Sequence, residues 1–172
     1  MFESHDRISL QLSKIYYTHP AQRRCLMVDT LSVAARSHRM SLITGRNTKP
    51  EISLRRGLHA TGLRYRIHVG KLPGKPDIVF GPAKLIVFVN GCFWHGHTCP
   101  DGHIPKSNSE FWKEKICKNR IRDARNIRAL RQSGWKVVVV WECRLRKNED
   151  VIREVGRVRS RILKRQPERD RA

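Results

Sequence analysis

The sequence has no long hydrophobic run. Its longest apolar stretches, Leu85–Val89 and Val137–Trp141, contain five residues each, whereas a membrane-spanning helix needs about 20. The first 25 residues also lack the continuous apolar segment and small-residue cleavage site of a secretory signal. We therefore expect a cytoplasmic protein that makes no contact with a membrane.

Acidic residues are scarce. The chain has 15 Asp and Glu against 36 Lys and Arg, which gives a formal net charge of +21. The basic residues are spread from Arg23 to the segment 153–171. Such an excess indicates a polyanionic partner, and nucleic acid is favoured over a lipid surface because no lipid-seeking segment accompanies the charge.

The length of 172 residues suits one domain with tails. Residues 1–35 have no sustained period and predict a flexible arm, with a short helix near Thr30–Arg39. We place the folded domain at residues 36–147 and a basic C-terminal helix and tail at residues 148–172. Valines recur at helical spacing in this last segment.

A capping box at Thr48–Glu51 predicts the start of a helix that runs to about Thr61. Its apolar positions should face the core and leave Arg55 and Arg56 to solvent or phosphate.

A second capping box, Ser107–Glu110, predicts the start of a long basic helix that runs to about Gln132. Asn119 and Asp123 interrupt its apolar stripe, so we expect the middle of this helix to face a polar site.

Apolar patterning predicts four strands. They span residues 63–69, 78–80, 84–90 and 135–142. Residues 84–90 are apolar at successive positions, which favours a central strand covered on both faces. The element order indicates an α/β fold with a mixed central sheet flanked by helices.

A cluster of thiols and imidazoles could hold zinc. Five cysteines are an odd number in a chain without an export signal, which disfavours a disulfide framework. The four candidate zinc ligands are Cys92, His97, Cys99 and Cys143. Asp101 or His103 would substitute if Cys143 lies elsewhere, and the alternative is two buried cysteines beside surface histidines.

A second candidate site depends on strand pairing. If the strand after Asp77 pairs with residues 84–90, Asp77 lies near the far end of that partner, beside Val89, Asn90 and His95. Such a group could hold Mg²⁺ on a phosphate while the imidazole moves protons. The alternative is a turn aspartate and an unrelated loop histidine.

Phe93 and Trp94 are adjacent aromatic residues in the same loop. Aromatic residues usually belong to a core, but consecutive residues in a tight loop do not easily both point inward. We therefore expect one or both to be exposed for stacking on bases or wedging between them.

Several long segments resemble a known family, the very-short-patch repair (Vsr) endonucleases. They are RSHRMSLITGRNTKPEISLRRGLHATGLRYR, LPGKPDIVF, LIVFVNGCFWHGHTCP and FWKEKICKNRIRDARNIRALRQSGWKVVVVWEC, in the family's order and spacing. The similarity covers about Met27 to Arg146, and we expect the native chain to begin at Met27, so that residues 1–26 are not part of it.

The resemblance implies a restriction-endonuclease-like fold, a catalytic Mg²⁺ and a structural Zn²⁺. It also implies a DNA mismatch endonuclease that nicks double-stranded DNA 5′ of the thymine in T:G mispairs. These mispairs arise when 5-methylcytosine deaminates, and the nick starts very short patch repair. A MutL-type repair protein is an implied partner, and we expect a monomer.

By the same resemblance, Asp77 ligates the magnesium, Val89 lends a backbone carbonyl and His95 is the catalytic acid or base. Glu51 lies near the site and assists. Asn90 stands where well-known members carry a second histidine, which removes one possible proton carrier.

The zinc ligands implied by the resemblance are the four already identified from their spacing. The implied mismatch wedge is formed by Phe93 and Trp94, with Met40 entering from the other groove. Two rival interpretations remain: a catalytically impaired, zinc-stabilised DNA-binding module, and a restriction-type nuclease without mismatch specificity.

Overall fold

The computed structural model describes residues 32, 34, 35, 38 and 45–163. The elements are α2 (Lys49–Ala60), β1 (Ile78–Phe80), β2 (Leu85–Asn90), η1 (Pro100–Gly102), α3 (Ser109–Gln132), β3 (Lys136–Trp141), η2 (Glu142–Leu145) and α4 (Asn148–Leu163). Most of the expected N-terminal arm and Met40 lie outside the described residues. Of the helix expected near Thr30–Arg39, only Ala34, Ala35 and His38 are described, and they are helical.

The described residues form a mixed three-stranded sheet in the order β1-β2-β3. β1 and β2 are antiparallel, with Ile78 opposite Val87. β2 and β3 are parallel, with Leu85 opposite Lys136, and α3 forms the crossover between them. The α/β class with helices flanking a mixed sheet, as predicted from the sequence, is confirmed.

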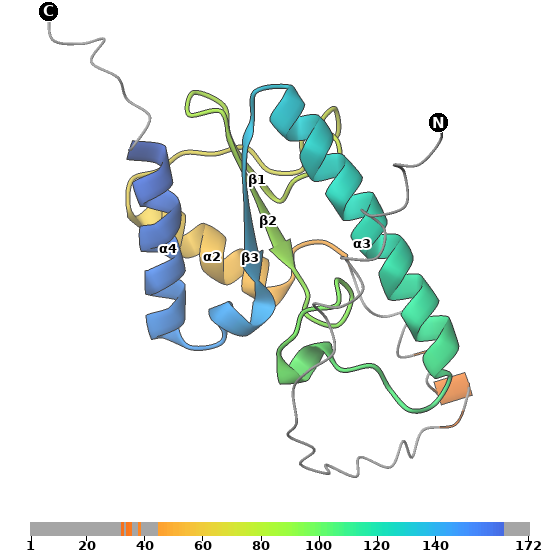
Figure 1. Cartoon of the computed structure of the whole chain (residues 1–172). Helices are drawn as coiled ribbons and strands as arrows, with labels where there is room; N and C mark the ends of the chain where they lie inside the picture. Colours follow the sequence, from red (N-terminus) through yellow and green to blue (C-terminus); the bar gives the residue numbers. More distant parts are fainter. Residues whose placement is uncertain (1–31, 33, 36–37, 39–44, 164–172) are drawn as a thin grey trace, which may run out of the picture.

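Helices cover both faces of the sheet, with α2 and α4 on one face and α3 on the other (Figure 1). Alternate strand residues therefore belong to different cores. Leu85 and Val87 pack in the core with α2 and α4, whereas Ile86 packs against Leu130 of α3. This double coverage explains why β2 is apolar at successive positions. The valines of α4, including Val155 and Val158, belong to the same core as α2.

The strand predicted at residues 63–69 is wrong in extent, because only Arg66 forms a bridge, to Val79. Arg66 and Val79 exchange two backbone hydrogen bonds of 2.9 and 2.8 Å. His68 has a left-handed backbone, with φ of 53°, and this conformation does not continue an extended ladder.

The first predicted capping box is confirmed, since the Thr48 hydroxyl caps α2 at the amide of Glu51. The second is wrong. α3 begins at Ser109 after Asn108, which has a left-handed backbone and makes no side-chain cap. Asn tolerates this conformation better than most residues. The helix therefore begins one residue later than it would if Ser107 were its N-cap.

No helix in the described part of the chain is long and apolar enough to cross a membrane.

Gly57 allows the close approach of α2 and α4. A Cβ at Gly57 would lie 2.7 Å from Cγ2 of Val155, whereas a Cβ at Gly156 in α4 would meet nothing within 4 Å.

We therefore expect a glycine-to-alanine substitution to have opposite effects on the stability of the fold in α2 and in α4. Gly156→Ala should stabilise the fold by about 0.5–1 kcal/mol because alanine favours the helix. Gly57→Ala should be destabilising, because overpacking costs about 1–3 kcal/mol and outweighs that gain. Urea unfolding of both variants measures the difference, and an equal gain in stability at both positions would contradict the packing of α2 on α4.

Candidate active site and metal centre

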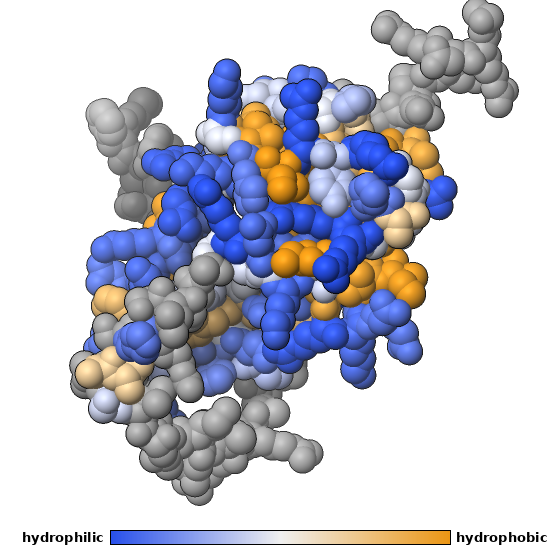
Figure 2. All heavy atoms as spheres, turned by 180° about the vertical axis from the view of Figure 1, so that it is seen from behind, coloured by the Kyte–Doolittle hydropathy of each residue, from blue (hydrophilic) through white to orange (hydrophobic). Residues whose placement is uncertain are grey.

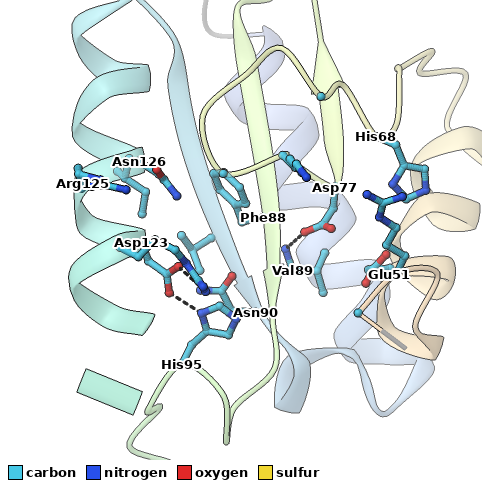
Figure 3. Close-up of a pocket in the computed structure, with 18 residues that line it drawn as sticks. Glu51, His68, Asp77, Phe88, Val89, Asn90, His95, Asp123, Arg125 and Asn126 are labelled. Carbon is cyan, nitrogen blue, oxygen red and sulfur yellow. Dashed lines mark hydrogen bonds and ion pairs between the residues drawn. The ribbon is translucent and has the colours of Figure 1, made fainter. Parts of the chain in front are cut away.

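A cavity of about 690 Å³ opens at the end of β2, between α3 and the segment that precedes β1. Asp77, Val89, Asn90 and His95 all line it. The antiparallel pairing of β1 with β2 brings the start of one strand to the end of the other. Figure 3 shows Asp77 and His95 facing this one cavity from different sides, as their positions in the sequence predict.

The carboxylate of Asp77 is tied to β2. Its Oδ2 accepts a hydrogen bond of 2.7 Å from the backbone N–H of Val89. Burial raises the pKa of Asp77 to about 6, and the negative charge of Glu51 adds to the rise, while the Val89 N–H and Arg55 act in the opposite direction. The cavity thus holds a partly desolvated carboxylate, whose ionised form a bound cation would favour.

His95 is held by a partner on α3. Its Nδ1 lies 2.5 Å from Oδ2 of Asp123. Nearby, the Asn119 side chain donates a hydrogen bond of 2.9 Å to the carbonyl of Trp94. The two polar residues that interrupt the apolar stripe of α3 therefore both fix the loop after β2, which confirms that the middle of this helix faces a polar site.

Glu51 lines the cavity, but its carboxylate is already engaged. It accepts hydrogen bonds of 3.0 Å from the backbone N–H of Asn47 and from Nη2 of Arg55. Only 3% of Glu51 is exposed. Its structural role is to cap α2 and to form a buried ion pair.

The prediction that Arg55 faces solvent or phosphate is wrong, because only 8% of this residue is exposed. Besides Glu51, its guanidinium donates to Oδ1 of Asn47 at 2.7 Å and to the backbone carbonyl of Asp77 at 3.3 Å. A buried carboxylate needs a cation, and this pairing draws Arg55 inward. Its neighbour Arg56 is exposed, as predicted.

The four predicted zinc ligands converge on one point. One ligand atom each from Cys92, His97, Cys99 and Cys143 lies within 4.8 Å of the others. Sulfur atoms around a tetrahedral zinc ion are roughly 3.8 Å apart, so this donor set fits zinc with little movement. The substitutes considered for Cys143 are not needed: Asp101 pairs with Arg146 at 2.6 Å, and exposed His103 contacts the carbonyl of Pro100.

Burial and the neighbouring thiols disfavour ionisation of two cysteines in this cluster. Burial raises the pKa of Cys92 to about 12 and also raises the pKa of Cys143. A divalent cation is what would hold both as thiolates.

The loop that carries these ligands is tightly folded. The His97 ring stacks on Trp141, with ring centroids 4.2 Å apart. A Cβ at Gly102 would lie only 1.9 Å from the His97 carbonyl oxygen, so glycine is required where η1 closes the loop.

The aromatic pair at the start of this loop is half-buried. Phe93 and Trp94 meet edge to face and both contact Trp112 of α3, with centroid distances of 5.0 and 5.9 Å. Phe111, which is 49% exposed, extends the cluster at the surface. The rings therefore form one aromatic cluster beside the cavity, and neither Phe93 nor Trp94 is fully exposed.

The site combines a carboxylate at the start of a strand, an imidazole held by a second carboxylate, and a wide cavity lined by basic residues. This arrangement suits metal-assisted hydrolysis of phosphodiesters.

A family model described as "DNA mismatch endonuclease Vsr" matches residues 28–101. The type II nicking enzyme V.NmeAIP of Neisseria meningitidis is 49% identical over 128 residues, covering 74% of this chain and 91% of that protein. The DNA mismatch endonuclease Vsr of Escherichia coli K12 is 42% identical over 128 residues, covering 74% and 82%.

The chain therefore belongs to the Vsr DNA mismatch endonuclease family, a family of hydrolases that act on DNA. This confirms the family resemblance and the enzyme class inferred from the sequence.

The roles of two residues of the site differ from those that the sequence predicts. The pattern of α3 predicts a polar position at Asp123 but not its pairing with His95, and the pattern of α2 predicts a surface position for Arg55. The interruption of the α3 stripe pointed to Asp123. For Arg55 the available signal was Glu51 four residues earlier, which is the spacing of a helical ion pair.

We expect Arg55→Met to destabilise the fold by about 3–5 kcal/mol, because it leaves Glu51 buried without its cation. Arg56→Met is the matched control on the exposed side of α2 and should change stability by less than about 0.5 kcal/mol. Chemical unfolding of both variants measures this, and equal effects at the two positions would refute the buried ion pair.

The purified protein should contain one zinc ion per chain. Cys99→Ser should lose the zinc and much of the folded structure, because structural zinc contributes folding free energy. Cys117→Ser, at an exposed cysteine outside the cluster, should keep both. Elemental analysis with circular dichroism tests this, and a Cys99→Ser protein that still holds one zinc would remove Cys99 from the site.

Proposed function

We propose that this protein nicks double-stranded DNA 5′ of the thymine in T:G mispairs, which arise by deamination of 5-methylcytosine, and so starts very short patch repair. The observation that carries the proposal is the convergence of Asp77 and the Asp123-held His95 on one cavity in a member of the Vsr family. The relatives include a mismatch endonuclease and nicking enzymes, which supports a strand-specific cut.

His95 is the proton acceptor in this proposal. Its Nδ1 is taken by Asp123, which leaves Nε2 to receive a proton from the attacking water. Asp123 fixes the ring and stabilises the imidazolium that forms. Asn90 lines the same cavity without a titratable group, so its proposed role is to hold water or phosphate by hydrogen bonds.

Asp77 would hold Mg²⁺, together with the backbone carbonyl of Val89. Mg²⁺ typically takes one or two carboxylates and completes its shell with substrate phosphate and water. Asp77 and Val89 line the cavity side by side, and the desolvated carboxylate of Asp77 fits this requirement. When bound, the cation supplies positive charge to the phosphate and the leaving oxygen. Glu51 assists only indirectly, because its Oε2 accepts from Asn47 and Arg55 and its Oε1 accepts from the Thr48 hydroxyl.

The lining of the cavity suits a DNA backbone. Arg46, Lys75, Arg122 and Arg125 surround the carboxylates, and the molecular face in Figure 2 is mostly hydrophilic with small apolar patches. Phosphate contacts from these cations would position the strand without reading its sequence.

Recognition of the mispair would come from the aromatic cluster. Phe93 and Trp94 lie beside the catalytic histidine, and rearrangement of their edge-to-face packing would let them insert at the weakened T:G step. Met40, which lies outside the described residues, is the proposed second wedge.

The proposal also includes features that the family suggests. They are a restriction-endonuclease-like arrangement of the sheet and helices, structural Zn²⁺ at the four-ligand cluster, a monomeric enzyme and cooperation with a MutL-type repair protein.

The deciding experiment compares a T:G duplex with a matched duplex of the same sequence, each with and without Mg²⁺. We expect nicking of the T:G duplex alone, on the thymine strand, and only with the cation. Equal cleavage of both duplexes would favour a restriction-type nuclease. Tight binding without cleavage would favour an inactive DNA-binding module.

Asp77→Ala should abolish nicking while retaining DNA binding, because it removes the proposed cation ligand and leaves the basic lining intact. Asp150→Ala, at a carboxylate in the first turn of α4, should retain activity. Single-turnover nicking with a parallel binding assay measures both variants. Turnover by the Asp77→Ala protein would remove this carboxylate from the mechanism.

A further inference from the structure

A second basic concavity lies at the opposite end of the sheet from the active site. It has a volume of about 720 Å³ and is bounded by the end of α3, the start of β3 and the last turns of α4. Figure 1 shows α3 and α4 ending on either side of β3, toward the top of the view, whereas β2 runs down toward the catalytic loop. The lining residues are Arg131, Trp135, Lys136, Val137, Arg157, Ser160 and Arg161.

Among the described residues, those that line this concavity carry charge of one sign. Neither residues 124–137 nor residues 156–163 contain Asp or Glu. Glu154 precedes Arg157 on α4, but it is 2% exposed and pairs with Arg157 at 2.6 Å. Its negative charge is therefore neutralised inside the protein and does not offset the surface cations.

The concavity also has an ordered wall. Arg157 donates to the backbone carbonyl of Val139 at 3.0 Å, which fixes it against the sheet. Trp135 is half-buried, and the Lys84 ammonium lies 4.9 Å from the centre of its ring. Cations from α3, β3 and α4 thus line one concavity together with an aromatic residue, an arrangement that suits a phosphodiester chain better than a single small anion.

We propose that this concavity, with Arg131, Lys136 and Arg161 as its phosphate-binding cations and Arg157 as part of its wall, binds the backbone of a second DNA segment while the active site holds the mispair. The two ends of β3 are about 16 Å apart at roughly 3.3 Å per residue, and the helices flank the strand between them. The proposal rests on DNA as the substrate but not on the chemistry assigned to Asp77. Its consequence is that one protein molecule bridges two duplex segments.

The test uses the full-length protein and a short matched duplex in excess, without added Mg²⁺, with stoichiometry read by native mass spectrometry. We expect complexes of one protein with two duplexes. The double variant Arg131→Glu/Arg161→Glu should form only one-to-one complexes. The salt slope of its total DNA binding should fall by about 2, because each phosphate that the protein neutralises adds about 0.9 to that slope.

Arg56→Glu/Lys147→Glu is the matched control, with the same change in charge at exposed residues of another surface groove. It should keep the two-duplex complex. Both double variants should nick a short T:G duplex at the wild-type rate, so failure of the proposed function would appear separately as an inactive wild-type protein.

Three results would overturn the proposal. They are a wild-type protein that binds a single duplex, equal loss of the second duplex in both double variants, and loss of folding stability without loss of the second duplex in Arg131→Glu/Arg161→Glu. The last result would mean that these arginines serve only to offset the negative ends of α3 and α4.

Discussion

The hydrogen bond between the Val89 N–H and the Asp77 carboxylate is the contact on which the site depends. It joins the start of β1 to the end of β2 at 2.7 Å, and it exists because the two strands are antiparallel with a short connection. If the register slipped by one residue, every side chain of β1 would change faces. Asp77 would then leave the cavity, and the core residues Ile78 and Phe80 would leave their cluster.

The helices on the two faces of the sheet support different residues of the site. On one side, α2 and α4 bury the larger core, and the Glu51–Arg55 pair anchors α2 behind Asp77 through the Asp77 carbonyl. On the other side, α3 contributes Asp123 to hold His95. The residues that hold the proposed cation ligand and the proposed base thus come from opposite layers, while Asp77 and His95 themselves meet where β2 ends.

The metal-ligand cluster and the aromatic cluster share one short loop. Cys92 follows the end of β2 and is fully buried, and Cys143 follows the end of β3. Both belong to the metal-ligand cluster. Because β2 and β3 are parallel neighbours, their ends place these two thiols together. A structural metal would therefore hold the loop that carries His95, Phe93 and Trp94, and losing it should affect both chemistry and recognition.

The sequence alone determined the elements and the ligand types. The apolar runs of β2 and β3, the Thr48 cap and the grouping of Cys92, His97 and Cys99 are local patterns, and local patterns survive without knowledge of the fold. Tertiary structure alone decided that Arg55 turns inward to the backbone carbonyl of Asp77, that residues 63–69 pair only at Arg66, and that Asp123 reaches His95. These outcomes depend on contacts between residues distant in sequence, whose energies are set by burial and by the neighbours that packing supplies.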